Sequence, residues 1–496
     1  MVTKSSLKIA LLGSLFVGVI LSPLHLLSDT SNPLGPVSPD QNAEKLFQSI
    51  PAELQNLDYA IYTSNKNYDT ERFNFNKRFN VFPHAIFTPT NAQEVAFVLK
   101  SLKKNKLDFA IRSGGHCYEP ASLSTGFIID LRNFKTIQPD VKNEEVYIGA
   151  GVESGAVIEA LGKLDYAIPT GTCPSVGIAG LALGGGIGPL VRSFGLTCDS
   201  IKSISFINAN GELMEVTEKS HPDLFWALRG AGNGSFGIVL GFTFKMYAVP
   251  KASYLELTFG DSWDTKVSAK VLKTWQTWAE TLPESINTQL QLRYVNGKSF
   301  IKVVALKVGP DKCTEWEKAF SELKPDVKTY GERYLDTALR WAQTPTQPFQ
   351  KGKSKILMKP ITYDVIETAV NYFENLEETE QKFDVAYDFE ALGGAVVKGD
   401  SAFYPRKAFG WWHMEFYWDD EVESPHSLWC INEFFTDINF HTSKYSYANN
   451  VDYDLTKNWL EAYYGDNVNR LIEIKTKYDP ENIFHWRQSI PTKGMR

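Results

Sequence analysis

The sequence predicts an α+β fold, in which a first part of short strands, helices and glycine turns is followed by an antiparallel sheet covered by helices. Before residue 250, short apolar runs alternate with helical segments and glycine turns. Two Asn-Gly dipeptides, at 210–211 and 296–297, each join two apolar runs, as in β-hairpins. After residue 254, alternating strands accompany amphipathic helices at 312–323 and 367–375. The 496 residues suffice for two or three domains.

Local signals place the elements in order. A helix is expected to start after Thr90 or Asn91, with Val95, Val98 and Leu99 at helical spacing. Residues 43–57 are weakly helical, and a last helix is expected at 471–477. The remaining expected elements are strands at 109–111, 127–131 and 146–148, a hairpin at 204–216, a helix at 222–232, a strand at 255–259, a helix at 274–282 and a hairpin at 289–306.

The composition argues against nucleic-acid and metal-binding functions. The net charge is −7, from 58 acidic and 51 basic residues, whereas nucleic acids and anionic membranes are bound by basic surfaces. The five cysteines form no CxxC pair, and the eight histidines form no HExxH motif. We therefore expect no nucleic-acid partner and no metal.

The N-terminus has the pattern of a targeting segment. Lys4 and Lys8 precede an apolar run from Ile9 to Leu21, which is typical of a secretory signal peptide or a short signal anchor. We assign this segment to residues 1–27 and expect an exported protein, secreted or periplasmic, with membrane contact only through a possible anchor. Residues 28–42 are rich in Pro, Ser, Asn and Asp and are expected to form a linker.

Two glycine turns each carry one nucleophilic side chain. The run Arg112-Ser113-Gly114-Gly115 delivers His116, and the turn Gly171-Thr172-Cys173-Pro174 delivers Cys173 just before the glycines at 184–186. The layout matches neither a dinucleotide-binding GxGxxG fingerprint nor a P-loop. A flavin ring is one flat ligand that takes both a histidine and a cysteine.

The strand at 411–418 carries a second group of polar residues. Alternation puts Trp411, His413, Glu415 and Tyr417 on one face, and puts Trp412, Met414, Phe416 and Trp418 on a face that suits a core. A histidine and a glutamate beside aromatic rings predict a lined site, although a solvated sheet face with a surface His–Glu pair is an equally good interpretation of the residues alone.

Four motifs together resemble the berberine bridge enzyme-like flavoprotein oxidases, which have the vanillyl-alcohol-oxidase or PCMH-type FAD-binding fold. The motifs are RSGGH at 112–116, GTCPSVGIAGLALGGGIG at 171–188, DLFWALRGAGNGSFGIV at 223–239 and YDPENIFHWRQSIP at 478–491. The resemblance implies a two-subdomain FAD-binding domain at 43–252 and a substrate-binding domain at 253–449. A C-terminal segment at 450–496 would return to the FAD domain.

The resemblance also implies how FAD is held. In the family, covalent bonds to FAD often come from the residues that match His116 and Cys173. The residue that matches Val176 governs oxygen access, and valine favours an oxidase over a dehydrogenase. Leu181 departs from the family, whose members often carry a histidine there. The implied cofactor-binding residues are His116, Cys173, Arg112, Ser113, Gly114, Gly115, Val176, Gly177, Gly180, Gly186, Gly237 and Ile238.

The implied reaction is oxidation of a small-molecule substrate, with O2 reoxidising the flavin and forming H2O2. Asn450 stands where the family's Tyr-x-Asn-Tyr motif has its second tyrosine, and an amide is no base. Glu415 is therefore the expected catalytic base, with Tyr447 or Tyr118 as weaker candidates, and Trp411, His413, Tyr417 and Asn450 are expected to face the substrate. A sugar or oligosaccharide is favoured. The alternatives are a phenolic or alkaloid-like alcohol or an amine, a dehydrogenase that passes electrons to quinone, and a flavin-binding protein with impaired catalysis.

Overall fold

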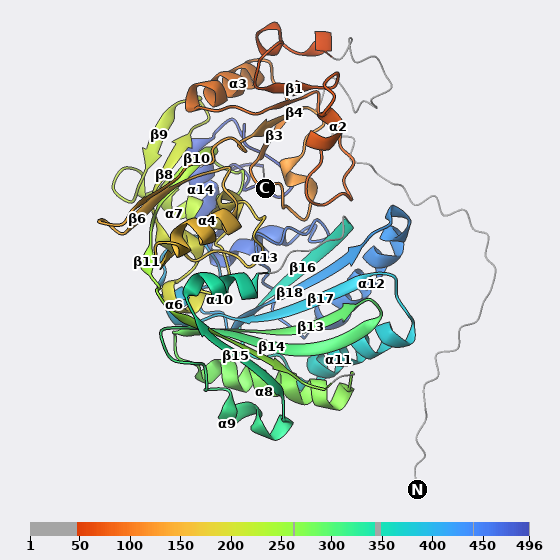
Figure 1. Cartoon of the computed structure of the whole chain (residues 1–496). Coiled ribbons are helices and arrows are strands. Elements are labelled where there is room, and N and C mark those ends of the chain that lie inside the picture. The colour runs from red at the N-terminus through yellow and green to blue at the C-terminus, as the bar shows by residue number, and fades with distance from the viewer. Residues whose placement is uncertain (1–46, 261–262, 343–348, 440, 496) are drawn as a thin grey trace, which may run out of the picture.

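The computed structural model describes residues 47–260, 263–342, 349–439 and 441–495. The expected targeting segment at 1–27 and the linker at 28–42 lie outside these residues. Within the described part of the chain, none of the helices has both the length and the apolar composition that a bilayer crossing requires. The predicted α+β class is confirmed, because helices accompany two small sheets and one large antiparallel sheet (Figure 1).

The first part of the chain forms two small sheets with their helices. One sheet has the order β1 (Ala60–Tyr62), β2 (Ala85–Phe87), β4 (Phe127–Asp130), β3 (Phe109–Arg112), and its last two pairs are parallel. The other is antiparallel, with the order β5 (Ile137–Asp140), β6 (Glu145–Gly149), β10 (Ile238–Lys245), β8 (Ile201–Ile207), β9 (Leu213–Val216). A short pair joins β7 (Tyr166–Ala167) to β11 (Tyr247–Ala248).

Helices pack against these sheets and share one core with them. The side chain of Asn91 accepts a hydrogen bond from the Glu94 N–H and so caps the helix that begins at Ala92, which confirms one of the two predicted caps. The helices of this part are α2 (Tyr68–Glu71), α3 (Ala92–Lys104), α4 (Ser154–Gly162), α5 (Ile178–Leu183), α6 (Val191–Phe194) and α7 (Pro222–Ala231). The segment 43–57, expected to be weakly helical, is described from residue 47 on, with helical residues at 47–49 and a 3-10 turn at Ala52–Leu54.

The C-terminal segment packs into this same core. Helices α13 (Trp459–Tyr464) and α14 (Val468–Tyr478) lie among the N-terminal elements (Figure 1). Tyr447, Leu471 and Ile490 belong to the core that also contains residues of β2, β6 and β8. The chain therefore leaves the first part for about 200 residues and then returns to it.

The intervening residues form a seven-stranded antiparallel sheet. Its order is β15 (Asp326–Glu332), β12 (Ala252–Thr258), β14 (Lys298–Val308), β13 (Ile286–Val295), β17 (Asp384–Ala391), β18 (Gly410–Trp418), β16 (Phe349–Leu357). The turn between β13 and β14 has positive φ at both Asn296 and Gly297, as the predicted Asn-Gly hairpin requires. One face is covered by α8 (Thr265–Thr281), α11 (Tyr363–Glu378) and α12 (Ser424–Asn439), whose apolar residues share a core with Trp412 and Phe416.

One predicted helix begins five residues later than expected, at Glu317 instead of Lys312. The segment 312–323 contains only the short helix α9 (Glu317–Phe320) and a 3-10 turn at Ser321–Leu323. The Cys313 N–H donates to the Ser253 hydroxyl of β12, and the Glu315 carboxylate pairs with Lys307 of β14. These contacts with the sheet replace the first turn of the helix. The remaining helix, α10 (Tyr334–Trp341), packs against β12 and α4.

Candidate active site

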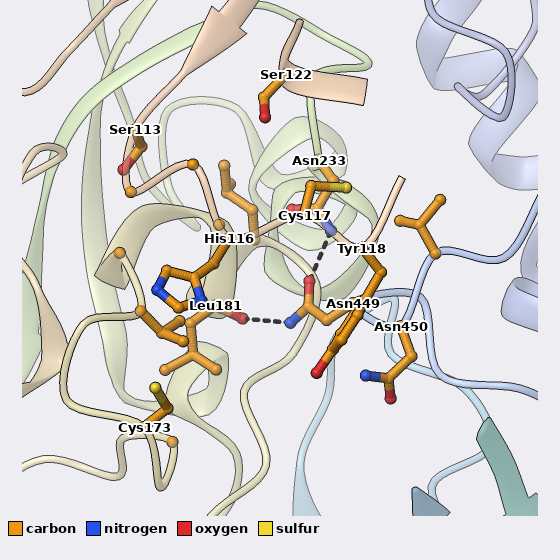
Figure 2. A pocket seen from close by; sticks show the side chains of 18 of the residues that line it. Ser113, His116, Cys117, Tyr118, Ser122, Cys173, Leu181, Asn233, Asn449 and Asn450 are labelled. Atoms are coloured by element: carbon orange, nitrogen blue, oxygen red, sulfur yellow. Dashed lines mark hydrogen bonds between the residues drawn. The ribbon is translucent and has the colours of Figure 1, made fainter. Parts of the chain in front are cut away.

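A cavity of about 310 Å³ lies where the glycine turns of the first part meet the uncovered face of the large sheet. Its walls come from residues 113–118, from 171–183, from strand β18 and from the loop at 447–451. Figure 2 shows His116 and Cys173 from the first two stretches and Asn450 from the last. The four stretches that the sequence singled out separately therefore share one cavity.

His116 and Cys173 meet at a single hydroxyl. Ser175 Oγ lies 3.0 Å from His116 Nε2 and 3.4 Å from Cys173 Sγ. The His116 ring stacks on Phe75 with 4.0 Å between the ring centroids. Burial lowers the pKa of His116 to about 4, so its imidazole is neutral near pH 7. Both side chains lie on the same side of the pocket (Figure 2), and a neutral imidazole is the nucleophilic form.

The two glycine turns cross at a distance that side chains would prevent. A Cβ on Gly114 would lie 2.4 Å from the backbone nitrogen of Gly177, and a Cβ on Gly177 would lie 2.6 Å from that of Gly114. Gly115 has a φ of +67°, in the left-handed region that favours glycine. A Cβ on Gly180 would meet no atom within 4 Å, because this position faces open space. The turns thus bring bare backbone to the cavity.

Glu415 lies on strand β18, where its carboxylate accepts a hydrogen bond from Tyr118. The Tyr118 hydroxyl is 2.5 Å from Glu415 Oε1. Burial, followed by the charge of Glu415, raises the pKa of Tyr118 well above its usual value, so the phenol keeps its proton. Gly352 of β16 makes room for this ring, since a Cβ there would be 2.8 Å from it.

Asp388, His413 and Glu415 form a compact polar cluster. One ligand-type atom from each lies within 4.8 Å of the others. His413 is directly opposite Asp388 in the pairing of β17 with β18. Each group has a protein partner: Arg293 forms a 2.5 Å ion pair with Asp388, the Asn450 amide lies 3.0 Å from His413 Nε2, and Tyr118 bonds Glu415. The expectation that no metal binds stays a prediction.

Tyr447, the other tyrosine considered as a base, is hydrogen-bonded to the glycine run at 184–186. Its hydroxyl oxygen accepts hydrogen bonds from the backbone N–H of Gly186 at 2.8 Å and from the Asn449 amide at 2.8 Å. Burial raises its pKa above the usual value. These bonds favour a supporting role for Tyr447 over proton transfer.

Most of the predicted site residues line this one cavity, and three do not. Arg112 is buried in a 2.6 Å ion pair with Asp130. Gly186 contacts Tyr447 through its N–H, and Ile238 is fully buried in the core. The predicted residues that do line the cavity are Ser113, Gly114, Gly115, His116, Tyr118, Cys173, Val176, Gly177, Gly180, Gly237, Trp411, His413, Glu415, Tyr417, Tyr447 and Asn450.

The sequence did not reveal several further residues of the site. Asp388 and Gln289 line the cavity from β17 and β13, and Gln350 lines it from β16. Asp388 could have been found from the alternation of residues 384–391. Val385, Tyr387 and Phe389 enter the core, so Asp388 must lie on the other face of the strand. Ser175, which joins His116 and Cys173, is an ordinary turn serine in the sequence and carries no such signal.

Comparison with known proteins identifies two family models in the chain. An FAD binding domain model matches residues 83–217, which include His116 and Cys173. A model described as berberine and berberine like matches residues 446–491, which include Tyr447 and Asn450. Both models therefore cover residues of the cavity wall.

Individual relatives span nearly the whole chain. An uncharacterised FAD-linked oxidoreductase of Bacillus subtilis, YgaK, is 34% identical over 441 residues, covering 86% of this chain and 95% of the relative. Berberine bridge enzyme-like 25 of Arabidopsis thaliana is 27% identical, covering 92% and 89%. Among solved structures, BBE-like 1 of Physcomitrella patens has a TM-score of 0.78 and 26% identity, covering 88% of this chain and 97% of that one.

The residues of the cavity fit FAD. Bare glycine backbone allows a flat ring system to approach closely, and Gly180 opens onto free space. A neutral imidazole and a thiol meet beside it at Ser175. The residues that would hold the cofactor are those of the turns at 113–116 and 173–180. FAD, when bound, supplies the hydride-accepting chemistry of such a site.

Proposed function

Because the chain belongs to the berberine bridge enzyme-like family of FAD-linked oxidoreductases, we propose that it is an oxidase that converts a substrate alcohol into a carbonyl compound. The substrate loses a proton from its hydroxyl and a hydride from its carbon, and O2 takes up the two electrons as H2O2. The observation that carries the proposal is that Glu415, a buried carboxyl group, lines the same cavity as His116 and Cys173.

Glu415 is proposed as the base that accepts the hydroxyl proton. It is nearly buried, and Tyr118 donates to one of its oxygens, which orients the carboxylate. An ionised carboxylate has about four lone-pair sites, so it can accept a substrate hydroxyl beside this bond. The base candidates that remain are weaker, since Tyr118 keeps its own proton and Tyr447 is engaged by Gly186.

We also propose that FAD is attached through both His116 and Cys173. Neutral imidazole and thiolate are the nucleophilic forms of these side chains. The lowered pKa of His116 supports the first bond, and the common contact with Ser175 supports attachment of both residues to one ring system. Two tethers would keep the cofactor in a cavity that is open to substrate.

The polarity of the sheet wall favours a sugar or oligosaccharide as the substrate. Gln289, Gln350 and Asp388 line the cavity beside Glu415, and amide and carboxylate groups bind sugar hydroxyls. Trp411, which is expected to face the substrate, stacks one face of its ring on His413, with 4.7 Å between centroids. An aromatic alcohol is the alternative, because a relative of 27% identity is a monolignol oxidoreductase of Arabidopsis thaliana.

The proposal that oxygen is the electron acceptor is supported by Val176, which lines the cavity three residues after Cys173.

The proposal that the protein is exported is supported by the basic and apolar pattern of residues 1–27. Fractionation of expressing cells, with N-terminal sequencing of the recovered protein, tests export: activity confined to the cytoplasm would contradict it.

The function is tested by mixing the purified protein with panels of mono- and oligosaccharides and of phenolic alcohols, while H2O2 release and a quinone-like dye are followed in parallel. Peroxide from sugars supports the proposal. Activity only on phenolic alcohols selects the alternative substrate, and dye reduction without peroxide selects a dehydrogenase. Flavin that no compound reduces would contradict an enzymatic function.

A further inference from the structure

A chain of polar groups in contact runs from Trp411 to Glu415 through the asparagine that replaces the family's tyrosine. The first two links are hydrogen bonds, and the last, between His413 and Glu415, is an ion-pair contact. Trp411 Nε1 donates to Asn450 Oδ1 at 3.1 Å. Asn450 Nδ2 lies 3.0 Å from His413 Nε2, and His413 Nδ1 lies 3.5 Å from Glu415 Oε2. Asn450, His413 and Glu415 are 4%, 7% and 9% exposed, so water competes little for these contacts.

The donor and acceptor roles along this chain of polar groups follow from the indole N–H of Trp411. An indole N–H can only donate, so the Asn450 atom that faces Trp411 is the carbonyl oxygen. The Asn450 amide nitrogen then faces His413, and an amide nitrogen can only donate. His413 Nε2 must therefore be the acceptor, which leaves the proton of the neutral ring on Nδ1, the nitrogen next to Glu415.

The groups of this chain have little freedom to rearrange. The Trp411 and His413 rings stack at an interplanar angle of 20°, and the Tyr118 ring packs edge-on against His413 with 5.6 Å between centroids. The backbone N–H of Asn450 donates to the Tyr447 carbonyl at 2.9 Å. Rotation of the Asn450 amide by 180° would place its NH2 against the indole N–H, two donors face to face.

We propose that Asn450 is a positioning residue that fixes His413 as its Nδ1–H tautomer, so that His413 and Tyr118 each donate to one oxygen of Glu415. The proposal rests on the proposed role of Glu415 as the base. Two neutral donors hold the carboxylate in one orientation without the positive charge that would weaken it as a base. Asn450 thus orients His413 in the site, and its presence in place of tyrosine does not indicate that catalysis has been lost.

The remaining charged and titratable groups around the pair are compatible with this arrangement. Asp388 of β17 faces His413, and it is paired with Arg293 of β13. Burial, followed by the charge of Glu415, raises the pKa of both Tyr118 and Tyr417, which keeps the two phenols neutral; the Tyr417 hydroxyl is thus a further neutral neighbour of the Glu415 carboxylate. Cys173 lines the same cavity and interacts electrostatically with Tyr118.

The test reads the His413 tautomer directly and needs no turnover. The holoprotein is labelled with 15N-histidine, and two-bond 15N–1H correlations are recorded, with His413→Gln to assign the ring. The proposal predicts an Nδ1–H ring in the wild type. It predicts an Nε2–H ring in Asn450→Asp, because an ionised aspartate can only accept. Asn449→Asp is the matched control, since Asn449 bonds Leu181, Tyr447 and Asn233 and not His413.

A kinetic readout accompanies the spectra. In anaerobic stopped-flow mixing, Asn450→Asp should lower the rate constant of flavin reduction by about 10²-fold, within the usual range for general base catalysis, with a much smaller change in the apparent substrate dissociation constant. An Nε2–H ring in the wild type, or an unchanged tautomer in Asn450→Asp, would overturn the proposal. Unimpaired flavin reduction by Glu415→Gln would instead refute the proposed base while leaving the tautomer result standing.

Discussion

The hydroxyl of Tyr118 donates a 2.5 Å hydrogen bond to Oε1 of Glu415, although the two residues lie 297 positions apart. Tyr118 follows the glycine turn of the first part of the chain, and Glu415 lies in the middle of β18 of the large sheet. This bond therefore links the two walls of the cavity, and it places the candidate base within reach of a substrate that lies between them.

Removing this donor is expected to slow the reaction while the cofactor stays bound. In Tyr118→Phe, the carboxylate of Glu415 loses the bond that orients it, and we expect flavin reduction to slow by about 10- to 100-fold, below the full range for loss of a general base. Anaerobic stopped-flow absorbance measures the rate. Tyr334→Phe, which removes a buried hydroxyl from α10, is the control and should reduce flavin normally. Equal rates in both variants would argue against the Tyr118–Glu415 pair.

The two proposed tethers predict distinct cofactor behaviour. Acid precipitation of the wild-type protein should leave the yellow colour in the pellet, because the flavin is covalently attached. His116→Ala and Cys173→Ala should each keep one bond, and the double variant should release its flavin into the supernatant. Absorbance spectra and the mass of flavin-bearing peptides report the result. Wild-type flavin found free in the supernatant would mean that the cofactor is held without tethers.

The buried carboxyl group of Glu390 should make the free energy of unfolding depend on pH. Burial raises the pKa of this carboxyl to about 8, from 4.5. Between these values the folded protein holds a proton that the unfolded chain has lost, so stability falls as pH rises. Glu390→Gln removes this loss while keeping the side-chain shape. Thermal unfolding should show that the advantage of the variant grows from pH 5 to pH 8, whereas a constant difference would contradict the raised pKa.

The cluster of Asp388, His413 and Glu415 is expected to work without a metal. Arg293, the Asn450 amide and the Tyr118 hydroxyl already engage its ligand atoms. Dialysis against EDTA, followed by assay in metal-free buffer, should therefore leave peroxide production unchanged. Loss of activity that returns with Zn²⁺ or Mn²⁺ would show that an ion displaces these partners.

Local patterns in the sequence were enough to predict much of the site. The glycine turns placed His116 and Cys173 at one cavity, and the alternation of residues 411–418 placed His413 and Glu415 on its wall. The approach of Asp388 and Gln289 to this wall could not be predicted in this way, because it depends on β17 and β13 pairing beside β18. The first part of the helix expected at 312–323 is absent for the same reason, since contacts with β12 and β14 outweigh local propensity there.

The role of Asn450 also depended on long-range contacts. From the sequence it was a missing tyrosine, and hence a doubt about the mechanism. Its partners, Trp411 and His413, come from a strand about 40 residues earlier, and only the packing of the 447–451 loop against β18 brings the three together.

The most direct measurement is anaerobic flavin reduction by Glu415→Gln, using a substrate that bleaches the wild-type flavin. Glu390→Gln, the same change at a buried carboxyl on the neighbouring strand β17, is the matched control. If Glu415 is the base, its variant should keep the flavin spectrum and lose about 10²- to 10⁴-fold in the reduction rate constant, while the control reduces its flavin at nearly the wild-type rate. A Glu415→Gln variant that bleaches within threefold of the wild-type rate would contradict the proposed mechanism.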